Sequence, residues 1–219
     1  RGSYADTVLA SASQVCVLPP GFDLDVAGAL PVAGCTAWIA VVEIGRISAG
    51  KRILILGASG GVGQLCVQVA RHVRDGFVVG VCSGKNVELV KGLGAQEVID
   101  YANGDALEQA RKHGPFDAIV DCVGGYSGPR CRGMLVSGGR HVMVAGESPL
   151  AIVQVLVPPF TSKALLGVTT RPRLQPMVDA IAAGKVKVNI ARRFPLSAAE
   201  EAHQLSQGGR MTGKILLNP

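Results

Sequence analysis

The sequence predicts a doubly wound α/β fold, in which helices cover both faces of a parallel sheet. From residue 52 onward, short runs rich in valine and isoleucine alternate with helical patterns, as in strands joined by crossover helices. These runs are apolar almost throughout rather than at every second position, so both faces of the sheet must be covered. A glycine-rich turn also joins the first run to the helix that follows it, which is typical of nucleotide-binding folds of this class.

The elements can be placed in chain order. Residues 1–20 look extended and close at a Pro-Pro-Gly turn, and residues 25–46 are mostly helical. Strands are expected at residues 52–56, 77–82, 97–100, 116–121 and 140–145. Between the first two strands, apolar residues at helical spacing predict an amphipathic helix; they are Val62, Leu65, Cys66, Val69, Ala70 and Val73. The chain then runs strand, helix and strand over residues 186–191, 198–206 and 214–217.

Composition excludes several classes of protein. The 219 residues are 48% hydrophobic and 17% charged, which is not the profile of a disordered chain. The net charge of +6 comes from basic residues that are scattered or paired, without interleaved aromatic residues, so no nucleic-acid partner is expected. The longest uncharged stretch, from Val26 to Val42, contains Gly28 and Pro31, so no membrane span is expected either.

The six cysteines form no C-x-x-C pair, and no histidine lies at ligand spacing from them. The sequence therefore predicts neither a local zinc site nor a redox dithiol. Most of them lie in apolar runs, where cysteine acts as a small buried hydrophobe. Such thiols favour a reducing compartment, and we expect a cytoplasmic protein, with an organellar location left open.

The glycine-rich turn from Gly57 to Gly63 predicts a dinucleotide site. A tight turn between a buried strand and a helix points backbone N–H groups and the positive end of the helix dipole at one place, which suits a pyrophosphate. Ala58, Gly60 and Gly63 occupy the three glycine positions of the fingerprint; Gly60 admits the pyrophosphate and Gly63 lets the helix approach the strand. No Gly-Lys-Ser/Thr follows, which excludes a phosphate-loop NTPase, and a tight turn without a ligand is the alternative.

The end of the second strand favours NADP(H) over NAD(H). An NAD site places Asp or Glu there to bind the ribose hydroxyls, whereas this chain has Ser83-Gly-Lys85-Asn. The nearest acids, Asp75 and Glu88, lie before the strand and in the following helix. A 2′-phosphate would therefore meet the Ser83 hydroxyl and the Lys85 ammonium. In the alternative interpretation, Lys85 is a solvated lysine at the start of a helix.

Several motifs together carry a family resemblance. They are Gly2 to Ala5, Ala29 to Trp38, Gly57 to Gly63, Gly94 to Tyr101, Asp121 to Gly125 and Arg210 to Leu217. With them the chain resembles the zinc-independent, zeta-crystallin-like quinone oxidoreductases of the medium-chain dehydrogenase/reductase superfamily. The resemblance covers essentially the whole chain, and the motifs are specific jointly rather than singly.

The resemblance implies an architecture. Members wrap a GroES-like, β-rich catalytic domain, built from both ends of the chain, around a Rossmann domain. Here that would give a partial catalytic domain at residues 1–33, an NADP-binding Rossmann domain at 34–157 and a return to the catalytic domain at 158–219. Because the chain begins at Arg1 and the first third of the catalytic domain has no counterpart, we expect an N-terminally truncated member. The family also implies a homodimer formed by edge-to-edge extension of the Rossmann sheet.

The resemblance also implies the cofactor contacts. Thr36 would lie near the nicotinamide, Ser59, Gly60, Gly61 and Val62 would hold the pyrophosphate, and Ser83, Lys85 and Tyr101 would surround the 2′-phosphate. Further contacts along the cofactor would come from Cys122, Val123, Gly124, Ala145, Gly146 and Arg210. Tyr101 could equally be a half-buried packing residue, and Asp121 is expected to brace a turn. The four histidines are expected at the surface or in packing roles.

The implied activity is NADPH-dependent hydride transfer to quinones or α,β-unsaturated carbonyls. This chemistry requires neither a metal nor a nucleophile, and we assign no catalytic residue. In the related zinc alcohol dehydrogenases a ligand cysteine stands where this chain has Val32, so no metal site is expected. The alternatives are an enoyl reductase of another medium-chain subgroup and a non-catalytic, NADP-binding structural protein.

Overall fold

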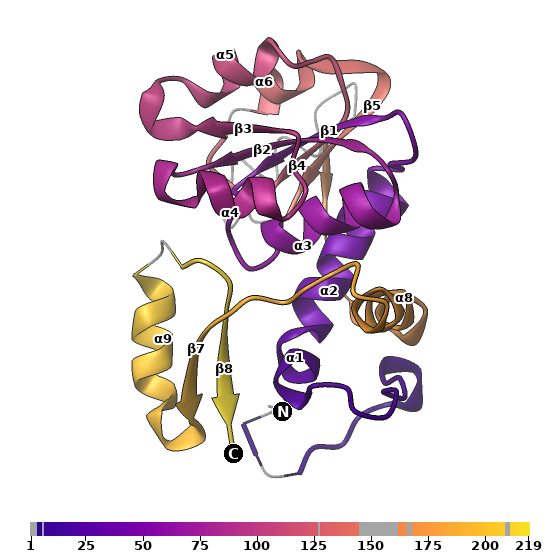
Figure 1. Cartoon of the computed structure of the whole chain (residues 1–219), viewed down its shortest axis with the longest axis vertical. Helices are drawn as coiled ribbons and strands as arrows, with labels where there is room; N and C mark the ends of the chain where they lie inside the picture. The colour runs from indigo at the N-terminus through magenta and orange to yellow at the C-terminus, as the bar shows by residue number, and fades with distance from the viewer. Residues whose placement is uncertain (1–3, 6, 127, 145–161, 166–167, 209–210) are drawn as a thin grey trace.

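A six-stranded parallel sheet forms the larger part of the protein (Figure 1). The computed structural model describes the whole chain except residues 1–3, 6, 127, 145–161, 166–167 and 209–210. The strands lie in the order β3-β2-β1-β4-β5-β6, which is the doubly wound order of dinucleotide-binding folds. They are β1 (Arg52–Leu56), β2 (Phe77–Cys82), β3 (Glu97–Asp100), β4 (Phe116–Asp121), β5 (Leu135–Met143) and β6 (Ser162–Ala164).

Helices cover both faces of this sheet (Figure 1). On one face lie α5 (Ala106–Arg111) and α6 (Gly128–Arg132). On the other lie α2 (Pro31–Trp38), α3 (Gly63–Gln68) and α4 (Val87–Gly92), and α8 (Arg171–Ala182) packs against α2. Two of these helices continue as π-helical segments, α2 through Ile39–Ile44 and α3 through Val69–Val73. None of the helices in the described part of the chain is long and apolar enough to cross a bilayer.

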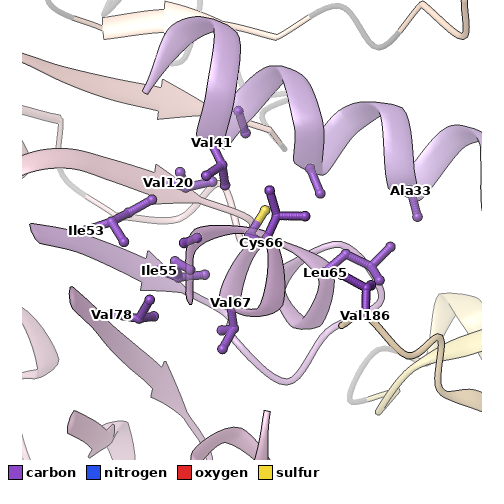
Figure 2. Packing of buried hydrophobic residues seen from close by; sticks show 14 of the residues in the cluster. Ala33, Val41, Ile53, Ile55, Leu65, Cys66, Val67, Val78, Val120 and Val186 are labelled. Atoms are coloured by element: carbon purple, nitrogen blue, oxygen red, sulfur yellow. The ribbon is translucent and has the colours of Figure 1, made fainter. Parts of the chain in front are cut away.

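The core divides into two clusters because successive strand residues point to opposite faces. Ile53 and Ile55 of β1 pack with α3 and α2 on one face, while Leu54 and Leu56 pack toward α5 and α6 on the other. Figure 2 shows the first cluster, in which Cys66 and Val67 of α3 lie near strand residues and Leu65 lies beside Val186. The apolar stripe of this crossover helix is therefore confirmed.

A smaller lobe carries both ends of the chain (Figure 1). It contains the helix α1 (Leu24–Ala29) and a parallel pair of strands, β7 (Ile190–Pro195) and β8 (Lys214–Asn218), joined by α9 (Ala199–Gln207). Within described residues 4–5 and 7–20, the structure has a 3₁₀ turn at Ala12–Gln14 and no strand, in keeping with an extended segment. The division into 1–33, 34–157 and 158–219 stays a prediction.

Two predicted strands are misplaced. The fifth was expected at residues 140–145 but spans Leu135–Met143, because a register shift against β4 between Phe116 and Ala118 lets the strand begin earlier. The strand expected at 186–191 is instead Ile190–Pro195. Val186 and Lys187 precede it in a connection whose backbone is bound by a side chain of α3, so its apolar residues pack without forming a strand.

Candidate functional site

The site lies at the carboxyl ends of the parallel strands, where β1 and β4 are neighbours. The chain leaves β1 toward β2 on one side, whereas β4 leads to β5 on the other, so the strand order reverses at this point. In open α/β sheets this reversal opens a crevice, and ligands bind there. Leu56 and Asp121 are paired as the last residues of the two strands, and the turns that follow them form the two sides of the crevice.

The glycine-rich turn after β1 has little room for side chains. Gly57 adopts a φ of +77°, and its N–H, like that of Ala58, donates to the Val81 carbonyl, at 3.1 and 2.9 Å. A Cβ atom on Gly63 would lie 2.2 Å from the Gly57 carbonyl oxygen. Glycine at 63 is therefore required for the close approach of α3 to the turn, as predicted. At the start of α3, the N–H groups of Gln64 and Leu65 donate to the carbonyls of Gly60 and Val62, both at 3.0 Å, so the helix is continuous with the turn.

A cavity of about 930 Å³ occupies the crevice. That volume is in the range of sites for cofactor-sized ligands. Seven residues predicted to bind the cofactor line it: Ser59, Gly60, Ser83, Lys85, Tyr101, Cys122 and Val123. Seven further residues line it that the sequence did not single out as contacts: Gly57, Cys82, Asn86, Ala102, Gly125, Tyr126 and Met211.

The turn after β2 supplies polar groups to this cavity. Ser83 precedes a 3₁₀ turn, Gly84–Asn86, which places the exposed Lys85 side chain and the buried Asn86 amide side by side in sequence. The Asn86 Nδ2 group donates to the Oγ atoms of Ser59, at 3.1 Å, and of Ser83, at 3.2 Å. The turns after β1 and β2 are thus joined through one side chain.

An acid that the sequence did not point to stands behind this turn. Asp100, at the end of β3, lies so close to Gly84 that a Cβ there would be 2.5 Å from its Oδ2 atom. The carboxylate accepts from the Ala102 N–H at 2.9 Å and lines a separate cavity of about 470 Å³. Burial, together with the Asp100 charge, raises the pKa of the Cys82 thiol to about 11.

The turn after β4 is braced by Asp121, as expected. Its Oδ1 atom accepts from the backbone N–H groups of Val123 and Gly124, both at 2.9 Å. Burial raises the pKa of the Asp121 carboxyl, and these N–H donors act in the opposite direction. The next residue, Cys122, has a thiol whose pKa is well above the ordinary value, because of its hydrogen bond with Cys66 and because of burial. Cys122 and Val123 line this side of the cavity.

The C-terminal segment crosses the glycine-rich turn. Gly213 forms an isolated parallel bridge with Gly60. A Cβ on Gly61 would lie 3.0 Å from the Gly213 carbonyl oxygen, so glycine at 61 eases this crossing, and its contact with the pyrophosphate stays a prediction. Met211 lines the cavity just before the bridge. One wall of the site thus comes from residues far away in sequence.

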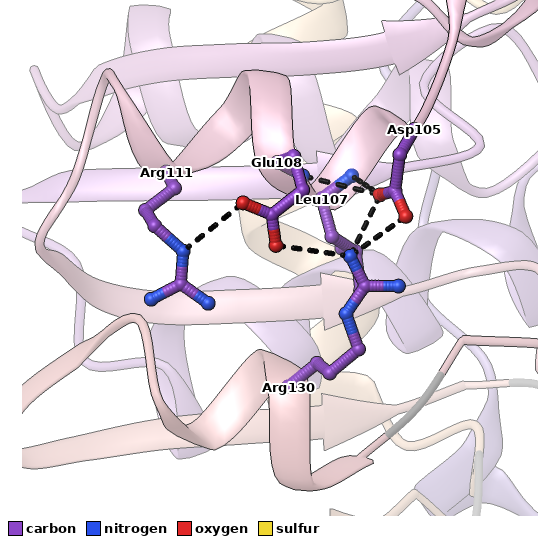
Figure 3. A network of polar contacts seen from close by, with 5 residues as sticks. All are labelled: Asp105, Leu107, Glu108, Arg111 and Arg130. Atoms are coloured by element: carbon purple, nitrogen blue, oxygen red, sulfur yellow. Dashed lines mark hydrogen bonds and ion pairs between the residues drawn. The ribbon is translucent and has the colours of Figure 1, made fainter.

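Beyond Tyr101 and Tyr126, an ion-pair network joins the loops after β3 and β4 (Figure 3). Arg130 of α6 donates to both carboxylate oxygens of Asp105, each at 2.8 Å, and to Glu108 at 3.2 Å. Asp105 also accepts from the Leu107 and Glu108 N–H groups and so caps α5. The network fixes the outer rim of the crevice, although its exposed charges contribute little stability.

The remaining predicted residues fall into two groups. Gly61, Val62 and Gly124 belong to the turns beside the cavity without being among its lining residues, and Thr36 is buried in α2, also away from the lining. Ala145, Gly146 and Arg210 lie outside the described residues. Of the histidines, His141 is fully buried and bonded to Ser162, and His203 is exposed, as the packing and surface interpretation expected.

Comparison with known proteins places the chain in a family. The model of the family described as zinc-binding dehydrogenase matches residues 93–217, more than half of the chain. The chloroplastic quinone oxidoreductase QR1 of Triphysaria versicolor is 32% identical over 228 residues, which cover the whole chain and 69% of that protein. The chain belongs to the medium-chain dehydrogenase/reductase superfamily.

Other members of the superfamily match at similar levels. The human mitochondrial NAD(P)H oxidoreductase RTN4IP1 is 34% identical over 244 residues, covering all of this chain and 61% of that protein. The solved structure of the quinone oxidoreductase from Coxiella burnetii superposes with a TM-score of 0.78 at 29% identity, covering 87% of this chain and 59% of the other. This medium-chain dehydrogenase/reductase thus spans about three fifths of the length of these two relatives.

Proposed function

We propose that the protein is an oxidoreductase that uses NADP(H) to reduce quinones or α,β-unsaturated carbonyls. The single observation that carries this proposal is the 930 Å³ cavity at the carboxyl ends of β1, β2 and β4, which holds a glycine-rich turn, two serine hydroxyls and a lysine. The relatives named as quinone oxidoreductases support the reaction type.

The residues present fit a dinucleotide phosphate. Gly60 places no side chain in the cavity that it lines, so phosphate oxygens can approach the backbone of the turn there. No Asp or Glu lines the cavity in the described part of the chain, and Ser83 with Lys85 offers a hydroxyl and a cation to a 2′-phosphate. Asp100 lines the neighbouring cavity instead and is not among the residues that line the proposed phosphate position.

The chain's own residues bind and orient in this proposal. NADPH, when bound, supplies the hydride. The glycine-rich turn and the two serines fix the phosphate end, while Cys122, Val123 and Met211 give the cavity an apolar side that suits a flat ring and excludes water. Holding two reactants in register lowers the barrier by as much as about 7–11 kcal/mol. We assign no catalytic acid or base.

We propose that the reaction needs no zinc. Val32 stands where a ligand cysteine is expected in zinc-dependent relatives, and its side chain is exposed on α2. The described residues bring no three His, Cys, Asp or Glu side chains together. Hydride transfer to an electron-poor carbon proceeds without a Lewis acid when the acceptor is already activated. Full activity after dialysis against a chelator supports this part, and loss of activity that zinc restores contradicts it.

The test of the proposed function is a binding and turnover experiment on the complete protein. NADPH binding is measured by fluorescence, and NADPH oxidation is followed by stopped flow with a panel of quinones, enones and enoyl thioesters. Binding with turnover of quinones or enones supports the proposal. Turnover restricted to enoyl thioesters indicates an enoyl reductase, binding without turnover indicates a structural role, and no binding of NADPH overturns the site.

Two further proposals concern the assembly of the protein and its location in the cell. We propose a homodimer built by extension of the sheet, since β6 is the edge strand of the described sheet and one side of it is unpaired there. Light scattering on the purified protein measures the mass directly, and a monomer contradicts the proposal. The human and Triphysaria relatives are named as mitochondrial and chloroplastic, which supports an organellar location beside the cytoplasmic one.

A further inference from the structure

We propose that Asn86 is a positioning residue that sets two serine hydroxyls as hydrogen-bond donors for the cofactor phosphates and ties the C-terminal segment to the same site. This inference rests on the proposed function, because it assumes that a dinucleotide fills the 930 Å³ cavity. It goes further by assigning the preparation of the anion site to a residue that is neither charged nor part of the glycine-rich turn.

Three hydrogen bonds converge on the Asn86 amide. Its Nδ2 atom donates to Ser59 Oγ at 3.1 Å and to Ser83 Oγ at 3.2 Å, and its Oδ1 atom accepts from Thr212 Oγ1 at 3.3 Å. The side chain is 9% exposed and still lines the cavity. It therefore lies at the junction of the turn after β1, the turn after β2 and the C-terminal segment.

The direction of these bonds decides what the serines can do. A carbonyl oxygen only accepts, so Oδ1 must take the hydroxyl hydrogen of Thr212, and both hydrogens of Nδ2 are left for the serines. Each serine oxygen is then an acceptor toward Asn86 and keeps its own hydrogen for another partner. Both hydroxyl hydrogens are thus free for anionic oxygens in the cavity, and a chain of bonds running in one direction strengthens each donor.

Charge in the cavity makes these donors valuable. Lys85 is the single Lys or Arg among its described lining residues, and its exposed side chain can serve only one end of a dinucleotide. Ser59 belongs to the turn expected at the pyrophosphate and Ser83 to the turn expected at the 2′-phosphate. One amide therefore prepares a donor for each phosphate group, whereas Lys85 can reach only one of them.

The same amide couples the site to the C-terminal segment. Thr212 is next to Gly213, which bridges to Gly60, so the hydrogen bond to Asn86 and the bridge hold one short segment against the turn. Docking of this segment and correct orientation of the serine donors should consequently depend on each other.

Two substitutions separate these roles. In Asn86→Asp the carboxylate can only accept, so the serine hydroxyls must turn toward it, while the bond from Thr212 is kept. In Asn86→Ala the serines are left to rotate and the bond from Thr212 is lost. Asn218→Asp is the matched control, since it adds the same charge on exposed β8 residue 218, outside the cavity lining.

Binding is measured with adenosine 2′,5′-bisphosphate and with ADP, by calorimetry, so that no turnover is needed. Asn86→Asp should weaken both probes by at least about 10-fold, because charged hydrogen bonds are lost at both phosphate positions. Asn86→Ala should weaken both by a smaller factor. Asn218→Asp should bind like the wild type. Thermal melting confirms that each variant is folded.

Amide hydrogen exchange over residues 211–217 gives the second readout. Exchange should rise in Asn86→Ala, where the segment loses the hydrogen bond from Thr212. It should stay at the wild-type level in Asn86→Asp, which keeps that bond. Equal binding of both probes by folded Asn86→Asp and wild type overturns the donor role, and unchanged exchange in Asn86→Ala overturns the tie. A wild-type protein that binds neither probe instead refutes the dinucleotide site itself, and the role of Asn86 with it.

Discussion

The side chain of Gln68 is hydrogen-bonded to both backbone groups of Lys187. Its Nε2 atom donates to the Lys187 carbonyl at 2.9 Å, and its Oε1 atom accepts from the Lys187 N–H at 2.7 Å. Gln68 lies in the crossover helix α3 and is 3% exposed. Its side-chain amide pairs with the backbone of the connection that leads into β7, as a neighbouring strand would. The helix that follows the glycine-rich turn thereby holds the smaller lobe in place.

Gln68→Met should destabilise the protein strongly. The substitution keeps the length of the side chain but removes both partly buried hydrogen bonds to the Lys187 backbone, at a cost of about 0.5–1.5 kcal/mol each. Urea unfolding should show a midpoint shifted to lower concentration. Gln204→Met, on the exposed face of α9, is the control and should change stability by less than about 0.5 kcal/mol. Equal midpoints for the two variants would contradict the bracing role of Gln68.

Gly63→Ala should damage the turn, whereas Gly92→Ala should not. A methyl group on Gly63 would meet the Gly57 carbonyl at 2.2 Å, and overpacking of this kind costs typically about 1–3 kcal/mol. Gly92 lies in α4, where an added methyl group would have nothing within 4 Å, so alanine there should stabilise the helix by about 0.5–1 kcal/mol. Melting temperatures measured side by side give the comparison. A Gly63→Ala variant as stable as the wild type would contradict the claim that α3 can approach the turn only with glycine at 63.

Lys85→Ala should discriminate between the two nicotinamide cofactors. A charged hydrogen bond contributes about 1.5–3 kcal/mol, so its loss should weaken NADPH binding roughly 10- to 150-fold and leave NADH binding nearly unchanged. Fluorescence titration with both cofactors measures this. Lys91→Ala, on exposed α4, serves as the control because it removes the same charge outside the cavity. Equal losses of affinity for NADPH and NADH would show that Lys85 does not bind the 2′-phosphate.

Stability should fall between about pH 6.5 and pH 4 because of His141. Burial, with a contribution from Arg132, lowers the pKa of this histidine to about 4. The unfolded chain takes up a proton near the ordinary pKa of about 6.5 while the folded chain does not, so stability present above pH 6.5 is lost as pH falls, by up to about 3 kcal/mol.

Urea unfolding at a series of pH values tests this dependence. His141→Asn removes the titrating ring and can keep a hydrogen bond to Ser162, so it should flatten the profile in that window although its absolute stability is lower. His203→Asn, at an exposed position, should retain the wild-type profile. A slope that survives in His141→Asn would assign the acid sensitivity to other groups.

The sheet could be predicted from the sequence because its signals are local. Strands β1 to β4 have the predicted bounds, since each is a short apolar run ended by glycine or polar residues. Strand β5 begins earlier than predicted because its first residues, from Leu135 to Gly139, carry exposed and glycine positions without an apolar run. Val186 was assigned to a strand because an apolar residue in a connection looks the same in sequence as one in a sheet.

The site could be predicted only in part. Ser59, Ser83 and Lys85 follow buried strands, and a parallel sheet brings such residues to one edge. Asn86 stands next to Lys85, but its role depends on Thr212, and no local pattern reveals a contact across that separation. Asp100 was missed for a related reason, since the search for an acid covered the end of β2 and the carboxylate arrives from the adjacent β3.

The bridge between Gly60 and Gly213 has a consequence for the order of events during synthesis. The two residues leave the ribosome about 150 positions apart, which at about 5–20 residues per second is a delay of roughly 8–30 s. Throughout that interval the sheet can form and the glycine-rich turn can take its shape while its outer wall does not yet exist. Under the proposed function, a nascent chain would therefore meet the cellular pool of dinucleotides with an open cleft, and would retain the cofactor tightly only after residue 213 has arrived.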